Sequence, residues 1–153
     1  MSDLNQLAEH LSRVLGSALT ETKLMVGELT VTVEPAHILE LLKHLRDDPE
    51  CEFKILVDIC GNDWPMRAKR FDVVYHFLSL TRNRRIRIKA SLSEGETMPS
   101  CVPLYPAAGW FEREAFDLYG IAFGGNPDLR RILTDYGFSG YPLRKDFPLT
   151  GYV

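Results

Sequence analysis

The chain has 153 residues, of which 45% are hydrophobic and 25% are charged, and its net charge is −3. These values are typical of one globular domain with one apolar core, and they exclude a global basic field that would attract nucleic acid. No run approaches the roughly 20 apolar residues of a membrane span, and the start of the chain lacks the basic and then apolar pattern of a secretory signal.

The first part of the chain alternates between helical and strand patterns. Apolar residues at helical spacing predict two amphipathic helices, the second of which begins at Pro35. Period-two alternation predicts strands, the first of them bent near Gly27. In chain order we predict a helix, a strand, a helix, a strand and a loop over residues 4–18, 23–33, 35–47, 53–59 and 60–69.

Two further strands, over 71–80 and 85–92, are separated by a short polar connection, which predicts a hairpin. The second strand alternates apolar with basic or polar residues, so that one face of the sheet is core and the other polar. A loop with three prolines over 93–106 leads to a helix over 107–119, which Gly120 caps. The apolar side of this helix is predicted to hold Trp110, Phe111, Ala115, Leu118 and Tyr119.

The last part of the chain, 121–153, is rich in glycine, proline and aromatic residues, and only 129–134 could form a short helical turn. Because disordered segments are poor in aromatic residues, we predict a tail that lies across a partner protein, or else one that packs on its own domain. The order of the elements predicts an α+β domain over 1–120, with a small mixed sheet and helices packed on one face, followed by an extended partner-binding tail over 121–153.

The spacing of histidines and cysteines indicates no metal site. His37 and His44 are about two turns apart on one predicted helix, which is too far to chelate one ion together. The cysteines lack Cys-x-x-Cys spacing, which argues against a disulfide framework and against a cysteine-ligated iron–sulfur cluster. We interpret the histidines as surface or hydrogen-bonded residues and the three cysteines as half-buried thiols: His10, His37, His44, His76, Cys51, Cys60 and Cys101.

Two charged groups allow a chemical interpretation. Glu114 and Asp117 can share a face of the last predicted helix, but Arg113 lies among these acids, which favours a salt-bridged helix surface over acid–base catalysis. The basic residues between Arg82 and Lys89 could contact phosphate, but no aromatic residue is interleaved for base stacking. A solvated sheet face is therefore favoured over a nucleic-acid site.

The charged residues of the last third are also those at which the chain resembles a known family. The run Glu112-Arg113-Glu114-Ala-Phe-Asp117-Leu-Tyr-Gly-Ile is similar to the signature helix of the 30 kDa subunit, also called the C-type subunit, of proton-pumping NADH-quinone oxidoreductase (respiratory complex I). Two further blocks, 127–138 and 142–153, continue the resemblance. Asn126 and Tyr141 depart from the family pattern, which usually has histidine at both positions, and relatives often continue beyond Val153.

The resemblance implies a non-catalytic structural subunit of the peripheral arm of this complex. It implies docking on the quinone-site (D-type) subunit and near the cluster-bearing (B-type) subunit, at the cytoplasmic face of the bacterial inner membrane or the mitochondrial matrix face. Membrane association is expected only through the complex. NADH, FMN, iron–sulfur clusters and quinone are expected in partner subunits, with no catalytic, cofactor-binding or metal-binding residue in this chain and no nucleic acid as partner.

The predicted docking surface combines charged residues with aromatic anchors. Buried charges cost desolvation unless they are paired, and a partner with complementary charges can supply that pairing. The predicted interface residues are Glu112, Arg113, Glu114, Asp117, Asp128, Arg130, Arg131, Tyr136, Phe138, Arg144, Lys145, Asp146 and Phe147.

Three alternatives remain at this point. One is a homologous subunit of a membrane-bound hydrogenase or a related oxidoreductase. The second is a small nucleic-acid-binding module that uses the strand from Arg82 to Lys89. The third is an enzyme that uses the acidic helix.

Overall fold

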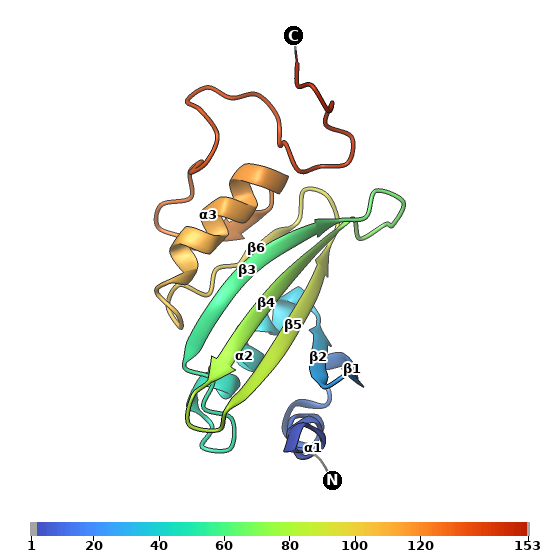
Figure 1. Cartoon of the computed structure of the whole chain (residues 1–153), viewed down its shortest axis with the longest axis vertical. Helices are drawn as coiled ribbons and strands as arrows, with labels where there is room; N and C mark the ends of the chain where they lie inside the picture. Colours follow the sequence, from blue (N-terminus) through green and yellow to red (C-terminus); the bar gives the residue numbers. More distant parts are fainter. Residues whose placement is uncertain (1–2, 153) are drawn as a thin grey trace.

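The computed structural model describes residues 3–152 and shows a twisted five-stranded sheet with helices beside it (Figure 1). The described elements are α1 (Asp3–Leu15), β1 (Leu19–Met25), β2 (Glu28–Val33), η1 (Pro35–His37), α2 (Ile38–Asp47), β3 (Ile55–Asp63), β4 (Phe71–Ser79), β5 (Arg84–Leu92), β6 (Thr97–Pro99), α3 (Ala108–Tyr119) and β7 (Ala122–Gly124).

The sheet has the strand order β1-β2-β5-β4-β3, and all neighbours are antiparallel except β2 and β5. The parallel pair arises because α2, β3 and β4 lie between β2 and β5 in the chain. The predicted hairpin is confirmed, since Phe71 pairs with Leu92 and Ser79 with Arg84. The predicted α+β class with a small mixed sheet is likewise confirmed.

The single bent strand predicted over 23–33 is wrong, because the structure has two strands there. Val26 and Gly27 both have positive φ, 53° and 76°, which is the geometry of a two-residue hairpin turn. Met25 therefore pairs with Glu28, and the chain reverses instead of bending. Gly27 was the sequence signal for this turn, because glycine readily adopts positive φ, but we interpreted it as the position of a bend within one strand.

The hydrophobic core lies between the sheet and the helices. Leu7 and Leu11 of α1 and Leu41 of α2 are fully buried in one cluster with Tyr75 and Phe77 of β4. Burying one such side chain contributes about 1.5–3 kcal/mol. Figure 1 shows α2 behind the sheet and α1 at its lower end, next to β1 and β2, while α3 lies alongside β3.

Helix α3 begins and ends as predicted, and Gly120 has the left-handed φ of 76° expected of its cap. Of its predicted apolar side, Ala115 is buried and Phe111, Leu118 and Tyr119 are half-buried, but the placement of Trp110 is wrong. Trp110 is 64% exposed, while the charged residues Glu112 and Asp117 are fully buried. The helix approaches β3 closely, because a Cβ atom on Gly61 would lie 2.7 Å from the ring of Tyr119.

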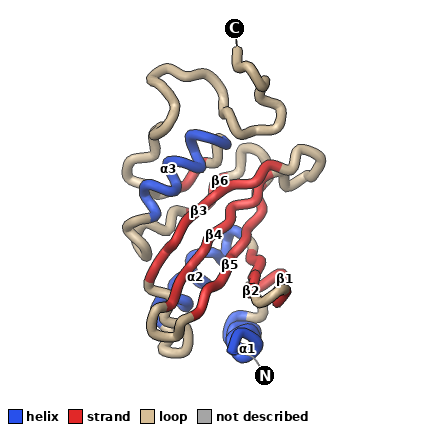
Figure 2. The backbone as a smooth tube through the Cα atoms, in the orientation of Figure 1, coloured by secondary structure: helices blue, strands red, loops and turns tan. Residues whose placement is uncertain are grey.

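The core continues beyond α3. Ile121 and Phe123 are buried, and β7 pairs in parallel with β6 as a small second sheet that we did not predict. Residues 125–152 form no helix or strand, so the helical turn predicted over 129–134 is wrong (Figure 2). None of the helices within residues 3–152 has the length and hydropathy of a membrane span.

Candidate functional site

The carboxylate of Glu112 in α3 holds together three parts of the chain. Its Oε2 accepts hydrogen bonds from the Ser100 hydroxyl at 2.7 Å and from the side-chain amide of Asn126 at 2.8 Å. Its Oε1 accepts one from the backbone N–H of Cys101 at 2.8 Å. A buried charged group needs such donors, and here they come from the segments before and after the helix. Asn126, one of the two departures from the family pattern, is thus part of this network.

Asp117, further along α3, organises the segment after the helix. Its Oδ2 accepts three consecutive backbone N–H groups, those of Ile132, Leu133 and Thr134, at 3.0, 2.7 and 2.9 Å. Its Oδ1 accepts the Thr134 hydroxyl at 2.6 Å and the Arg131 guanidinium at 3.0 Å. The backbone over 131–134 therefore bends around one carboxylate.

Burial and hydrogen bonding act in opposite directions on the pKa of Asp117. Burial raises the pKa, but the bonds from Thr134, Leu133 and Ile132 outweigh burial and hold the pKa well below its ordinary value. Asp117 is consequently a carboxylate at neutral pH. A permanently ionised, fully paired acid is suited to holding structure and not to proton transfer.

Two arginines fasten the same region. Arg131 donates to the carbonyl of Gly140 at 2.9 Å and lies 5.0 Å from the ring centre of Tyr141. Arg113 donates to the carbonyls of Arg130 and Arg131, at 3.1 Å each. The planar guanidinium allows several contacts at once, which a lysine would not reproduce.

A second group of ion pairs ties the segment to the end of the sheet. Arg70 binds the buried Asp63 at 2.6 Å and also contacts Asp146 at 3.1 Å. The backbone N–H of Lys145 donates to Asp63 at 2.7 Å, and Arg144 donates to the carbonyl of Tyr119 at 2.7 Å. The hydrogen bond from Arg70 is the main cause of the lowered pKa of Asp63. Sequence patterns did not single out Asp63 or Arg70, because no periodicity indicates that these two side chains meet.

Aromatic rings complete the arrangement within the segment. Phe138 stacks on Phe147 with ring centres 6.0 Å apart, and Phe147 meets Tyr152 edge-on at 5.2 Å. The ring of Tyr141, the second departure from the family pattern, lies 4.7 Å from the guanidinium of Arg144. The segment is thus held against the domain by charge pairs and hydrogen bonds between residues 126 and 146, while ring contacts link Phe138, Phe147 and Tyr152 within it.

Several large hydrophobic side chains of this segment are exposed to solvent, and those of Tyr136 and Leu149 are completely exposed. Charged residues, among them Asp135 and Lys145, are exposed between them. Exposed apolar side chains that gather on one segment favour a contact with another protein. We call this set the outer apolar face: Leu133, Tyr136, Leu143, Leu149 and Tyr152.

The structure divides the predicted interface residues into three groups, and as contacts with another protein they all stay predictions. The buried group, paired inside the chain, is Glu112, Arg113 and Asp117. The half-buried group is Arg131, Phe138, Arg144 and Phe147. The exposed group is Glu114, Asp128, Arg130, Tyr136, Lys145 and Asp146. Because Glu114 is exposed and Asp117 buried, the two acids do not form a shared catalytic pair.

The basic strand is largely neutralised by acids of the same chain. Arg84 is buried and bonds to Asp3 and to the carbonyl of Glu50. Arg87 donates to Glu28 at 2.9 Å. These pairings neutralise part of the positive charge that could contact phosphate, which weakens the nucleic-acid alternative.

Within residues 3–152, two groups of side chains could hold a metal ion, and neither was predicted. One combines His10, His44, Asp48 and Cys51 from α1, α2 and the turn that follows, and the other combines Asp58, Cys60 and His76 on β3 and β4. The His44-x3-Asp48-x2-Cys51 spacing in the sequence could have indicated three of the four residues of the first group. His10, 34 positions earlier in the sequence, could be found only from the packing of α1.

The chain is similar to proteins of one family over most of its length. The family model for the respiratory-chain NADH dehydrogenase 30 kDa subunit matches residues 31–153. A C-type subunit of NADH-quinone oxidoreductase from Methylobacterium sp. (strain 4-46) is 58% identical over 98% of this chain and 70% of its own length. Its namesake from Maricaulis maris is 57% identical over 98% of this chain and 75% of its own length.

A solved structure has the same fold. A chain of the membrane-bound sulfane sulfur reductase, an archaeal respiratory membrane complex, superposes with a TM-score of 0.80 at 24% sequence identity. The superposition covers 97% of this chain and 87% of the other. At this identity the likeness concerns the fold alone.

Proposed function

The chain belongs to the family of the respiratory-chain NADH dehydrogenase 30 kDa subunit, which includes the C-type subunits of NADH-quinone oxidoreductase, and we propose that it is a non-catalytic structural subunit of the peripheral arm of that complex. In this role it docks on the quinone-site (D-type) subunit and near the cluster-bearing (B-type) subunit, at the cytoplasmic face of the inner membrane. NADH, FMN, the iron–sulfur clusters and quinone are bound by the partner subunits.

The observation that carries this proposal is the outer apolar face on segment 125–152. Leu133, Tyr136 and Leu149 lie on backbone that has no helix or strand, yet that backbone is fastened to α3 through Asp117 and Arg131. Exposed apolar side chains on a segment held in one conformation lose little entropy when a partner covers them. The arrangement therefore favours stable docking over a transient contact.

The buried charges are paired within this chain, so in our proposal they do not bind the partner subunits directly. We expected Glu112, Arg113 and Asp117 to meet charges of another subunit, but each of them has partners within this chain. Their contribution to assembly is to shape the segment. The exposed charges, among them Arg130 and Lys145, remain available for a polar rim around the apolar contact.

A related oxidoreductase is the second candidate, because the fold is shared with a chain of the sulfane sulfur reductase complex. A corresponding subunit of a membrane-bound hydrogenase is a further possibility of this kind. Identifying the proteins that co-purify with the chain from its native membranes separates these assemblies.

Crosslinking tests the proposed docking position. A photoreactive amino acid placed at Tyr136 should crosslink to the quinone-site or the cluster-bearing subunit in assembled complex, as identified by mass spectrometry. The same group at Met66, which is equally exposed on the loop between β3 and β4, serves as the matched control. Crosslinks at Met66 but none at Tyr136 would contradict the proposed surface.

A further inference from the structure

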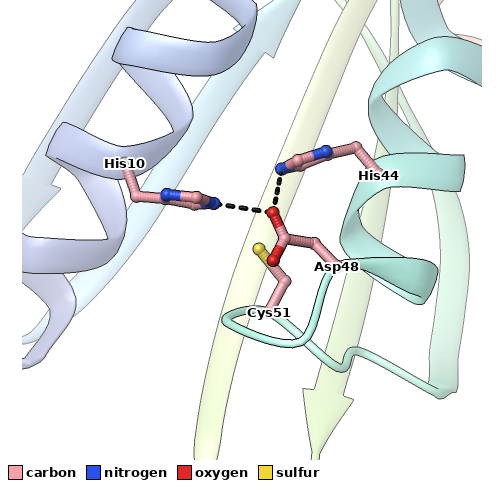
Figure 3. A group of neighbouring side chains, drawn as sticks. All are labelled: His10, His44, Asp48 and Cys51. Atoms are coloured by element: carbon pink, nitrogen blue, oxygen red, sulfur yellow. Dashed lines mark hydrogen bonds and ion pairs between the residues drawn. The ribbon is translucent and has the colours of Figure 1, made fainter.

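We propose that His10, His44, Asp48 and Cys51 form a structural zinc site that joins α1 to the end of α2. This inference is independent of the proposed function. It concerns the end of the molecule opposite segment 125–152 (Figure 1). The four side chains come from α1, α2 and the turn after α2, and all of them point to a common centre (Figure 3).

The two imidazoles converge on one carboxylate oxygen. Nε2 of His10 and Nε2 of His44 each lie 2.7 Å from Oδ2 of Asp48, and the two rings stack with their centres 5.6 Å apart. The buried Nε2 of His44 is aimed at this oxygen without the angle of a hydrogen bond. A nitrogen that points into a buried polar cluster without a proper hydrogen bond is suited to an ion as its partner.

The set of donor atoms fits zinc. Two imidazole nitrogens, one thiolate and one carboxylate oxygen are all common zinc ligands, and four protein ligands without an open position are typical of a structural site. The four donor atoms lie within 4.8 Å of one another. Bond lengths to zinc of about 2.0–2.3 Å require donors about 3.3–3.8 Å apart, so small side-chain rotations suffice.

Neighbouring groups already orient the ligands. The backbone N–H of Glu50 donates to Oδ1 of Asp48 at 2.8 Å, which leaves Oδ2 facing the two histidines. Nδ1 of His10, the ring nitrogen that faces away from the site, lies 3.4 Å from the carboxylate of Glu50 and 3.1 Å from the guanidinium of Arg13. Zinc at Nε2 requires the proton on Nδ1, so on binding this nitrogen must donate to Glu50 in place of accepting from Arg13. Carboxylates and backbone groups in this position fix ring orientation in known metal sites.

Charge and access also favour a divalent cation. Zinc takes cysteine as thiolate, so binding releases the Cys51 proton to solvent, and the ion with one thiolate and one carboxylate is then neutral. Cys51 is fully buried, and the side chains of His10, His44 and Asp48 are between 11% and 19% exposed. A surface depression of about 600 Å³ is lined by His44 and Asp48, two of the four proposed ligands.

The second group, Asp58, Cys60 and His76, is the weaker candidate. It offers three donors in place of four, and Cys60 is exposed. Arg87 donates to Nε2 of His76 at 3.0 Å, and Nδ1 of His76 lies 2.6 Å from Asp58, so both ring nitrogens have partners. This group serves as the internal control for the test of the first group.

Cobalt spectroscopy on the purified full chain, stripped of metal with a chelator, tests the proposal. One equivalent of Co²⁺ should produce the strong visible absorption of tetrahedral coordination together with a thiolate-to-cobalt charge-transfer band. Added Zn²⁺ should bleach both signals, and Zn²⁺ alone should raise the midpoint of thermal unfolding.

Single variants assign the ligands. Cys51→Ser should remove the charge-transfer band, and His10→Gln should weaken binding by about 100-fold or more, beyond the effect of losing an outer partner. The controls His37→Gln and Cys60→Ser, both at exposed positions, should bind as the unaltered chain does. Circular dichroism without metal verifies that each variant is folded.

Three results would overturn the proposal. The first is the absence of a tetrahedral cobalt spectrum from the folded chain. The second is unchanged affinity in folded His10→Gln together with an unchanged charge-transfer band in Cys51→Ser. The third is loss of the signal in Cys60→Ser, which would place the ion at the other group.

Discussion

Asp117 and Arg131 form an ion pair of 3.0 Å in which the carboxylate is fully buried, and this pair joins α3 to the segment that follows it. The same carboxylate accepts the N–H groups of three consecutive residues. One side chain of a helix thus determines the path of backbone that forms no regular structure. The conformation of residues 131–134 is therefore fixed by a tertiary contact.

Removing the Asp117 charge should destabilise the chain strongly. Asp117→Ala leaves three part-buried backbone N–H groups and the Arg131 guanidinium without their buried acceptor, and we expect a loss of about 3 kcal/mol in the free energy of unfolding. Urea denaturation of the purified chain measures this free energy of unfolding. Glu114→Gln is the matched control, because this neighbouring acid is exposed, and a change within about 0.5 kcal/mol is expected for it. Equal losses of unfolding free energy in Asp117→Ala and Glu114→Gln would refute the structural role given to Asp117.

The same residue predicts a dependence of stability on pH. The folded-state pKa of Asp117 is lowered, so its contribution is complete above the unfolded pKa of about 4 and is lost as pH falls below that value. Asp117→Asn should therefore lose less stability than the unaltered chain between pH 5 and pH 2. Some dependence remains because the pKa of Asp63 is lowered too. Parallel curves for the two proteins would show that Asp117 does not titrate as described.

Arg131 should be required for the conformation of the segment and not for that of the sheet. Arg131→Ala removes contacts to Asp117 and Gly140, and we expect cleavage by a protease within 125–152 to accelerate at least tenfold while β-sheet circular dichroism is retained. Arg131→Lys should restore only part of the protection, since an ammonium lacks the planar fork. Full protection in Arg131→Ala would mean that the aromatic contacts alone hold the segment.

Asn126 offers a test of the Glu112 network. Asn126→Asp keeps the side-chain oxygen that accepts the N–H of Asp128, but it places a second carboxylate where the amide now lies 2.8 Å from Glu112. The paired acids should have raised pKa values, so the variant should be about 2 kcal/mol less stable at pH 7 and should recover as pH falls toward 5. Asn126→Ala, measured alongside, should show a smaller loss without this recovery.

The cysteines should react unequally. Cys60 is exposed, whereas Cys51 and Cys101 are fully buried, which corrects our expectation of three half-buried thiols. In the metal-free chain burial raises the pKa of the Cys51 thiol to about 12 and that of Cys101 further, so neither forms the reactive thiolate at neutral pH. A thiol reagent should modify Cys60 in the native chain and all three residues only after denaturation. Mass spectrometry of the modified peptides distinguishes the sites.

The parts of the fold that sequence patterns predicted are those determined by local periodicity. Alternation along β5 predicted its buried residues, Ile86 and Ile88 among them, and Gly120 predicted the end of α3. The paired strands β6 and β7 escaped prediction because each has only three residues. A strand that short carries no measurable period.

The buried side of α3 could not be predicted for a different reason. Hydrophobicity favoured Trp110 for the core and Asp117 for the surface, and the structure has the opposite. Asp117 is buried because residues 14–17 positions later supply its donors, which no helical pattern reveals. The cluster around Asp48 was missed likewise, since His10 reaches it only through the packing of α1 on α2. In both cases the decisive contact is tertiary.

The most direct test of the account is whether the outer apolar face mediates assembly. The double variant Tyr136→Asp, Leu149→Asp changes two completely exposed residues and should leave the stability of the isolated chain unaltered. Met66→Asp is the matched control on another loop. After purification of the complex through a tag on the quinone-site subunit, we predict at least a tenfold loss of the double variant and normal retention of the control. Normal retention of the double variant would contradict the account.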